Sequence, residues 1–180
     1  MTLEHVNALK RDEFVTAIGW IFEHSPWVAE RAWPSRPFAH PEALHTSLTL
    51  QVQTASVDEQ LALLRAHPDL GTRARMTDAS TAEQTGAGLD QLTAGEFAHL
   101  NALNARYREK FGFPFLFAVK GSTKYDILGA LERRVTEEPA QEFREALNHV
   151  FRIARFRLDD IIEGDLPDGG LVPKDSMVTE

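Results

Sequence analysis

The chain has no cysteine among its 180 residues. Disulfides, thiolate nucleophiles, cysteine-bound zinc and iron–sulfur clusters are therefore excluded. Long hydrophobic runs are also missing: the longest nearly apolar stretch, residues 111–119, is far too short to span a bilayer. The first residues lack the apolar segment of a secretory signal, and the last residues are not a Ser-Lys-Leu peroxisomal signal. We therefore expect a cytoplasmic protein.

Basic residues are fewer than acidic ones, with 19 Lys and Arg against 27 Asp and Glu, which gives a formal net charge of −8. Such a field repels nucleic-acid phosphates and anionic lipid, so neither nucleic acid nor membrane is expected as a partner. With 43% of residues hydrophobic, the chain can still bury a substantial core. We expect residues 1–163 to form one domain and residues 164–180 to form a loosely ordered tail.

Apolar residues recur at the helical period almost throughout, which predicts an all-α, single-domain bundle of about seven to nine helices. Candidate helix starts carry capping patterns or an early proline. They are Asp12, Ser25-Pro26, His40-Pro41, Ser56 to Glu59, Ser80 to Glu83 and Thr93 to Glu96, with further starts near Thr123 and Pro139. One helix is expected to stop at His67-Pro68. Residues 113–119 are predicted to cross the core in extended form without building a sheet.

Familiar catalytic and ligand-binding motifs are absent. The seven histidines form no helical His-x-x-x-His pair, and no nucleophile elbow, phosphate-binding loop or dinucleotide fingerprint occurs. We therefore expect no dedicated metal site, and any chemistry must depend on isolated polar residues in unusual places.

His67 is one such residue, because it closes a helix before Pro68 and its ordinary pKa of about 6.5 suits proton transfer near neutral pH. The alternative is a histidine that only compensates exposed helix carbonyls. Ser80 and Glu83 match a reciprocal helix cap, which by itself needs no substrate. Glu83 and Gln84 beside free N–H groups at a helix start would suit a small anion.

Arg157 lies inside the apolar stripe of the last helix, where a cation must find an opposite charge. Its guanidinium can hold a substrate carboxylate through two hydrogen bonds. A structural ion pair with a buried Glu or Asp explains the position equally well, and the sequence leaves both explanations open.

Several motifs in this order resemble one family, the 2-oxo-4-hydroxy-4-carboxy-5-ureidoimidazoline (OHCU) decarboxylases. The likeness runs from Phe14 to about Ile162. It includes the segments Ser25-Pro26-Trp27, Arg36-Pro37-Phe38, Leu64 to Gly71, Ser80 to Leu89, Leu103 to Tyr107, Lys110 to Phe115 and Arg157-Leu158.

The resemblance implies an all-helical homodimer without a cofactor that acts on a small-molecule substrate. The implied reaction is decarboxylation of OHCU to (S)-allantoin, the last step of urate oxidation to allantoin. The family's catalytic histidine falls on His67. On chemical grounds we expect two further catalytic residues: Glu83, which would assist His67, and Arg157, the cation that would orient the substrate carboxylate. The substrate-binding residues it implies are Pro68, Ser80, Thr81, Ala82, Glu83, Gln84, Phe115, Leu116, Phe117, Ala118, Val119 and Arg157.

Two other functions are compatible with parts of the sequence. His67-Pro68-Asp69 is also the tripeptide of J-domain co-chaperones, but there it follows a strongly basic helix, whereas residues 57–66 hold one arginine and two acids. The second is a decarboxylase or lyase of the same scaffold that acts on another small ureido carboxylate, because a fold does not dictate its reaction.

Overall fold

The structure is a computed structural model that describes residues 1–71 and 77–162. The predicted tail, residues 164–180, lies outside the described residues. Within the described ranges the chain forms nine α-helices and two short 3-10 helices, and no strand. The elements are α1 (Leu3–Ala8), α2 (Arg11–Ile18), η1 (Gly19–Ile21), α3 (Trp27–Ala32), η2 (Trp33–Ser35), α4 (Pro41–Gln53), α5 (Val57–Ala66), α6 (Asp78–Gly86), α7 (Ala94–Phe111), α8 (Lys124–Arg134) and α9 (Pro139–Ile161). The predicted all-α class and helix number are confirmed.

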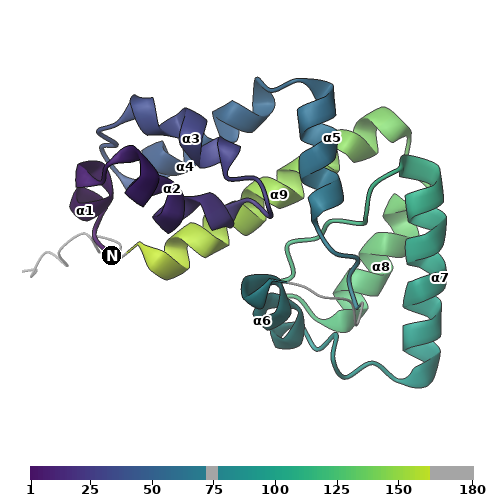
Figure 1. The fold of residues 1–180 in the computed structure, drawn as a ribbon. Helices are drawn as coiled ribbons and strands as arrows, with labels where there is room; N and C mark the ends of the chain where they lie inside the picture. The colour runs from purple at the N-terminus through teal and green to yellow at the C-terminus, as the bar shows by residue number, and fades with distance from the viewer. Residues whose placement is uncertain (72–76, 163–180) are drawn as a thin grey trace, which may run out of the picture.

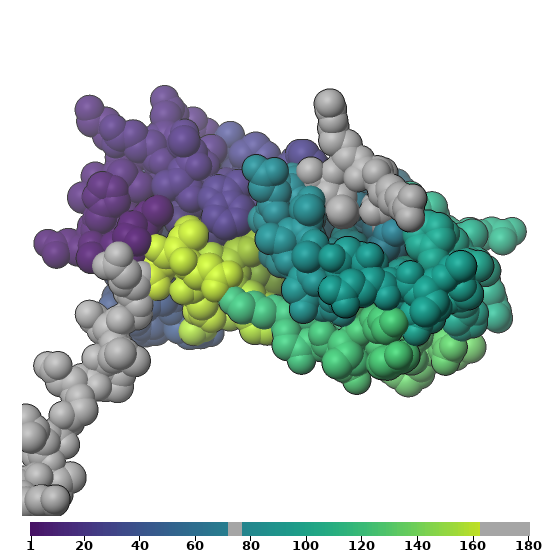
Figure 2. Space-filling model, turned by 90° about the horizontal axis from the view of Figure 1, so that it is seen from below, coloured from purple at the N-terminus to yellow at the C-terminus, as the bar shows by residue number. Residues whose placement is uncertain are grey.

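The long helix α9 joins the two halves of the molecule. It runs from the side of α7 and α8 to the side of α1 to α4, where the chain begins (Figure 1). Seen from below, its yellow atoms meet the purple N-terminal helices on one side and the green region on the other (Figure 2). Its contacts include α4, α5, α7 and η1. Ala154 and Arg157, which belong to the predicted stripe, lie on the buried face of this helix.

Most of the predicted helix starts are confirmed. Ser56, Thr93 and Thr123 each begin a helix with a capping box, in which the cap side chain and an acid three residues later bond each other's backbone. His40 caps α4 and is followed by Pro41, whose missing N–H costs nothing at that position.

The predicted start at Ser80 is wrong. Helix α6 begins at Asp78, and Thr77 is the N-cap whose hydroxyl accepts from the Ser80 N–H. Glu83 and Gln84 therefore lie in the second half of α6, where no free helix N–H groups are available to an anion. The earlier helix start means that two predictions were wrong: Ser80 and Glu83 do not form the helix cap, and no anion site lies beside them at a helix start.

Smaller differences affect the N-terminal helices. Helix α2 begins at Arg11 after Lys10 as N-cap, rather than after Asp12, and Pro26 is itself the N-cap of α3. Helix α2 also stops at Ile18 and tightens into η1. The prediction for residues 113–119 is confirmed, since this extended segment passes through the interior without a strand partner and only Phe117 is partly exposed.

In the two described stretches, no helix combines the length and the apolar character needed to cross a membrane.

Candidate functional site

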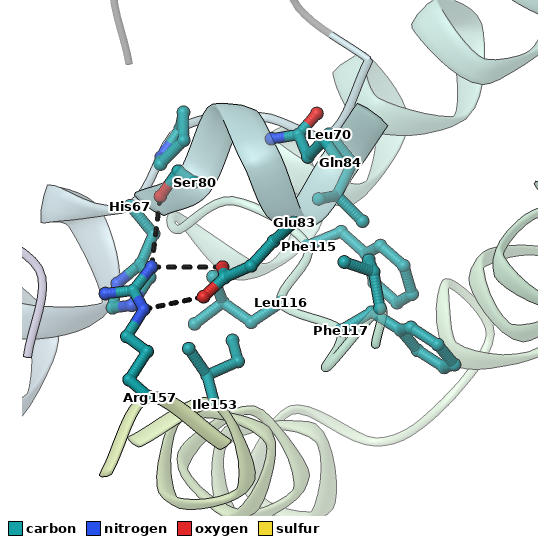
Figure 3. A pocket seen from close by; sticks show the side chains of 12 residues that line it. His67, Leu70, Ser80, Glu83, Gln84, Phe115, Leu116, Phe117, Ile153 and Arg157 are labelled. Carbon is teal, nitrogen blue, oxygen red and sulfur yellow. Dashed lines mark hydrogen bonds and ion pairs between the residues drawn. The ribbon is translucent and has the colours of Figure 1, made fainter. Parts of the chain in front are cut away.

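A pocket of about 340 Å³, counted with its opening to solvent, lies where the end of α5, the inner face of α6, the extended segment 113–119 and α9 meet. Figure 3 shows Arg157 reaching from α9 toward Glu83, which extends from α6, with the side chains of the extended segment along the other wall. The lining residues are His67, Pro68, Leu70, Ser80, Glu83, Gln84, Phe115, Leu116, Phe117, Val119, Ile153 and Arg157.

His67 is placed by the end of α5. Because Pro68 disfavours helical backbone in the residue before it, the helix ends at Ala66 and His67 adopts an extended conformation. The Nδ1 atom lies 2.9 Å from the carbonyl oxygen of Leu63, which can only accept, so Nδ1 carries the proton and Nε2 a lone pair. Burial lowers the pKa of His67 to about 4, so the ring is neutral at pH 7.

The turn that follows His67 is held by two buried amides. The Gly71 N–H donates to the Gln84 side-chain oxygen over 2.8 Å, and the Asn104 amide donates to the Leu70 carbonyl over 2.9 Å. Gly71 has a φ of +71°, and a Cβ there would lie 2.4 Å from a methyl carbon of Leu100. Only glycine fits this turn without a shift of its surroundings.

Arg157 uses all five of its N–H groups. Its Nε and Nη2 donate to the two carboxylate oxygens of Glu83 over 2.7 and 3.1 Å, a bidentate pairing. Its Nη1 donates to Glu23 and to the carbonyl of Ile21, both over 3.1 Å. Its Nη2 also lies 3.2 Å from the hydroxyl of Ser80. The burial of this cation is thus fully compensated.

The two carboxylates on Arg157 differ in accessibility. The side chain of Glu23 is 1% exposed, whereas that of Glu83 is 25% exposed. Burial alone would raise the pKa of Glu23, but hydrogen bonds from Thr77 and the charge of Arg157 outweigh it and hold this pKa below its usual range. Glu23 is the buried ion-pair partner that the structural explanation of Arg157 requires, and Glu83 is the partner at the pocket.

The extended wall of the pocket is anchored from behind. Arg134, completely buried, forms an ion pair with the equally buried Glu142 and donates to the Leu116 carbonyl over 2.8 Å. The Ala118 N–H donates to Nδ1 of His149 over 3.0 Å. Burial and nearby arginines lower the pKa of His149 to about 3, which keeps this nitrogen free to accept.

Most of the expected site residues come together. His67, Pro68, Ser80, Glu83, Gln84, Phe115, Leu116, Phe117, Val119 and Arg157 line the one pocket. Thr81 and Ala82 do not, because they lie on the exposed face of α6. Ala118 is buried behind the wall with its N–H already bonded to His149.

Sequence reasoning missed Glu23, Leu70 and Ile153. The apolar stripe around Arg157 signals that a buried carboxylate must exist, but nothing in the sequence selects Glu23 among the acidic residues.

A model of the OHCU decarboxylase family matches residues 7–159. The chain belongs to the OHCU decarboxylase family. A decarboxylase of this name from Haloferax volcanii is 52% identical over 158 residues, which cover 88% of this chain and 94% of that protein.

Two solved structures share the fold of this OHCU decarboxylase family member. A crystal structure of (S)-allantoin synthase has a TM-score of 0.74 and 34% identity, covering 91% of this chain and 54% of that longer one. A crystal structure of OHCU decarboxylase in the presence of (S)-allantoin has a TM-score of 0.63 and 26% identity over 74% of this chain and 89% of that chain.

Proposed function

We propose that this protein decarboxylates OHCU to (S)-allantoin. The observation that carries the proposal is the bidentate pairing of Arg157 with a partly exposed carboxylate, Glu83, in the pocket that holds the neutral His67. A substrate carboxylate can take the place of Glu83 on Nε and Nη2, because a guanidinium binds any carboxylate in this geometry. Glu83 thus occupies the position of the substrate carboxylate before the substrate binds.

The same arrangement supports a role for each catalytic group. Arg157 orients the carboxylate, and the C–C bond to it breaks as CO₂ leaves, with the electron pair retained by the unsaturated ring. Nε2 of His67 takes the hydroxyl proton, which turns that ring carbon into a carbonyl. Glu83, released from Arg157, assists His67. A proton added to one face of the ureido-bearing carbon gives the S product.

The substrate ring and its developing negative charge meet the extended wall. Since the Ala118 N–H is bonded to His149, the N–H donors for this charge are those of Leu116 and Phe117, which have no hydrogen-bond partner among the described residues. Ser80 and Gln84 face the pocket from α6 and contact the ring and ureido amides.

The direct test is to generate OHCU from urate with urate oxidase and 5-hydroxyisourate hydrolase, add the protein, and follow allantoin by circular dichroism. Rapid appearance of the S signal supports the proposal. Formation of optically silent allantoin at the rate of the protein-free control refutes it. That outcome would favour the alternative, a lyase of the same scaffold acting on another small ureido carboxylate.

His67→Asn separates proton transfer from helix capping. The asparagine amide can still donate to the Leu63 carbonyl, but it provides no counterpart of Nε2. We expect turnover to fall at least about 100-fold, the usual contribution of a general base, with little change in Tm. The matched control is His99→Asn, since His99 is half-exposed on α7 and bonds Glu132 away from the pocket.

We further propose a cytoplasmic homodimer, on the family resemblance and the sequence features given above. Light scattering after size exclusion tests the dimer, and cell fractionation tests the compartment. A monomer at micromolar concentration, or activity in an exported fraction, would contradict these expectations.

A further inference from the structure

We propose that Glu23 is a positioning residue that moderates the charge of Arg157, so that the substrate carboxylate is oriented without being held too tightly to leave. The inference rests on the proposed decarboxylation. It concerns a residue of the N-terminal half of the chain, 60 positions from Glu83 in sequence, and adds a role that neither the pocket lining nor the sequence motifs assign.

Glu23 joins three elements at the site. One carboxylate oxygen accepts from the Thr77 hydroxyl over 2.8 Å, and the other accepts from the Ser80 hydroxyl over 3.0 Å and from Arg157 over 3.1 Å. The loop after η1, the start of α6 and the buried face of α9 therefore meet at this one carboxylate. Its position is fixed before a substrate arrives, which is the condition for electrostatic preorganisation.

The backbone next to Glu23 is strained. His24 has a φ of +47°, the one positive φ of a non-glycine residue in the described ranges, and its side chain is exposed. Left-handed backbone is unfavourable for a residue with a Cβ and is retained where the surroundings enforce it. The turn at His24 directs Glu23 inward to Arg157, so the strained backbone conformation places this carboxylate beside the arginine.

Glu23 and Glu83 bind different N–H groups of the guanidinium: Glu83 takes Nε and Nη2, and Glu23 takes Nη1. Glu83 is partly exposed at the pocket and is the partner that a substrate replaces, whereas Glu23 is buried and stays. During the reaction Arg157 therefore faces the substrate carboxylate on one side and Glu23 on the other. The positive field at the substrate is weaker than that of an unopposed arginine.

This weakening favours the reaction. The ground state carries its charge on the carboxylate, and that charge moves into the ring as CO₂ forms. An unopposed Arg157 would stabilise the ground state more than the transition state, which tightens binding and slows turnover. Glu23 limits this ground-state stabilisation while keeping Arg157 in place.

The test is Glu23→Gln, in which the amide oxygen can still accept from Thr77 or Ser80 but the charge is gone. We expect KM for OHCU to fall about threefold or more while kcat falls about tenfold, the pattern of ground-state over-stabilisation. The inhibition constant of (S)-allantoin, which lacks the carboxylate, should change less than about twofold. Loss of structure alone would raise KM, so the lowered KM separates the two explanations.

Thr77→Val is the matched control, because it removes a hydrogen bond to Glu23 and the α6 cap but leaves the charge. Its KM should stay the same or rise. If Glu23→Gln does not fold, Glu23→Asp replaces it, because its side chain is one methylene shorter and holds the charge farther from Arg157. Both KM and kcat should then fall, but by less than in Glu23→Gln. An unchanged or raised KM in the folded Glu23 variant, with wild type active, overturns this inference alone. An inactive wild type overturns the proposed function and this inference with it.

Discussion

The pKa of His67 makes a prediction about how activity depends on pH. Burial, followed by the charge of Arg157, lowers this pKa against the opposing effects of the Leu63 carbonyl and Glu23, and the net value is about 4. A histidine with the ordinary pKa of about 6.5 would be about 90% neutral at pH 7.5 and about 10% neutral at pH 5.5, which is nearly a tenfold loss of base. With a pKa near 4, the ring stays almost wholly neutral over this range.

We therefore expect kcat/KM to change less than twofold between pH 7.5 and pH 5.5, and to fall only as the pH approaches about 4. OHCU is prepared at slightly alkaline pH and diluted into each buffer, and the spontaneous rate at each pH is subtracted. Since kcat/KM reports the free enzyme, it tests the ionisation described here. A tenfold fall centred on pH 6.5 would refute the assignment of a buried, neutral His67 as the base.

Lowered histidine pKa values also make the stability of the folded protein depend on pH. His67 and His149 both titrate at lower pH in the folded protein than in the unfolded chain, to about 4 and about 3. Below pH 6.5 the unfolded chain binds protons that the folded protein does not, so stability present above pH 6.5 is lost as the pH falls toward these values. The free energy of unfolding should decrease by about 1 kcal/mol per pH unit for each histidine. Urea unfolding at each pH checks this, and a flat profile from pH 6.5 to 4.5 would contradict it.

Three substitutions test other parts of the site. Glu83→Gln should lower kcat/KM about 100-fold. Because Glu83 is no helix cap, Tm should fall by only about 2–4 °C for each kcal/mol of ion pairing lost, and a much larger fall in Tm would make the role of Glu83 structural. Glu142→Gln leaves Arg134 buried without its counter-charge and should cost about 3 kcal/mol in urea unfolding, and a change below 1 kcal/mol would contradict this. His149→Leu removes the acceptor of the Ala118 N–H, which should cost about 1–3 kcal/mol and raise KM; unchanged KM would show that the wall needs no such anchor.

Local sequence signals predicted much of the fold because they act over a few residues. Capping boxes at Ser56 and Thr93 need only the cap and an acid three positions later, and both begin helices in the structure. The end of α5 follows from Pro68 alone. The same reasoning failed at Ser80, because Thr77 three residues earlier satisfies the helix start and leaves Ser80 free for Glu23.

The sequence by itself determined that this is an all-α protein without cysteine chemistry, that a helix ends at His67, and that Arg157 lies in a buried stripe. Only the tertiary structure decided which carboxylates meet that arginine, because Glu23 and Glu83 reach it over 134 and 74 residues of chain. No local pattern encodes such a pairing. It arises when α6 and the loop after η1 pack onto α9, and burial then selects which carboxylate stays and which faces the pocket.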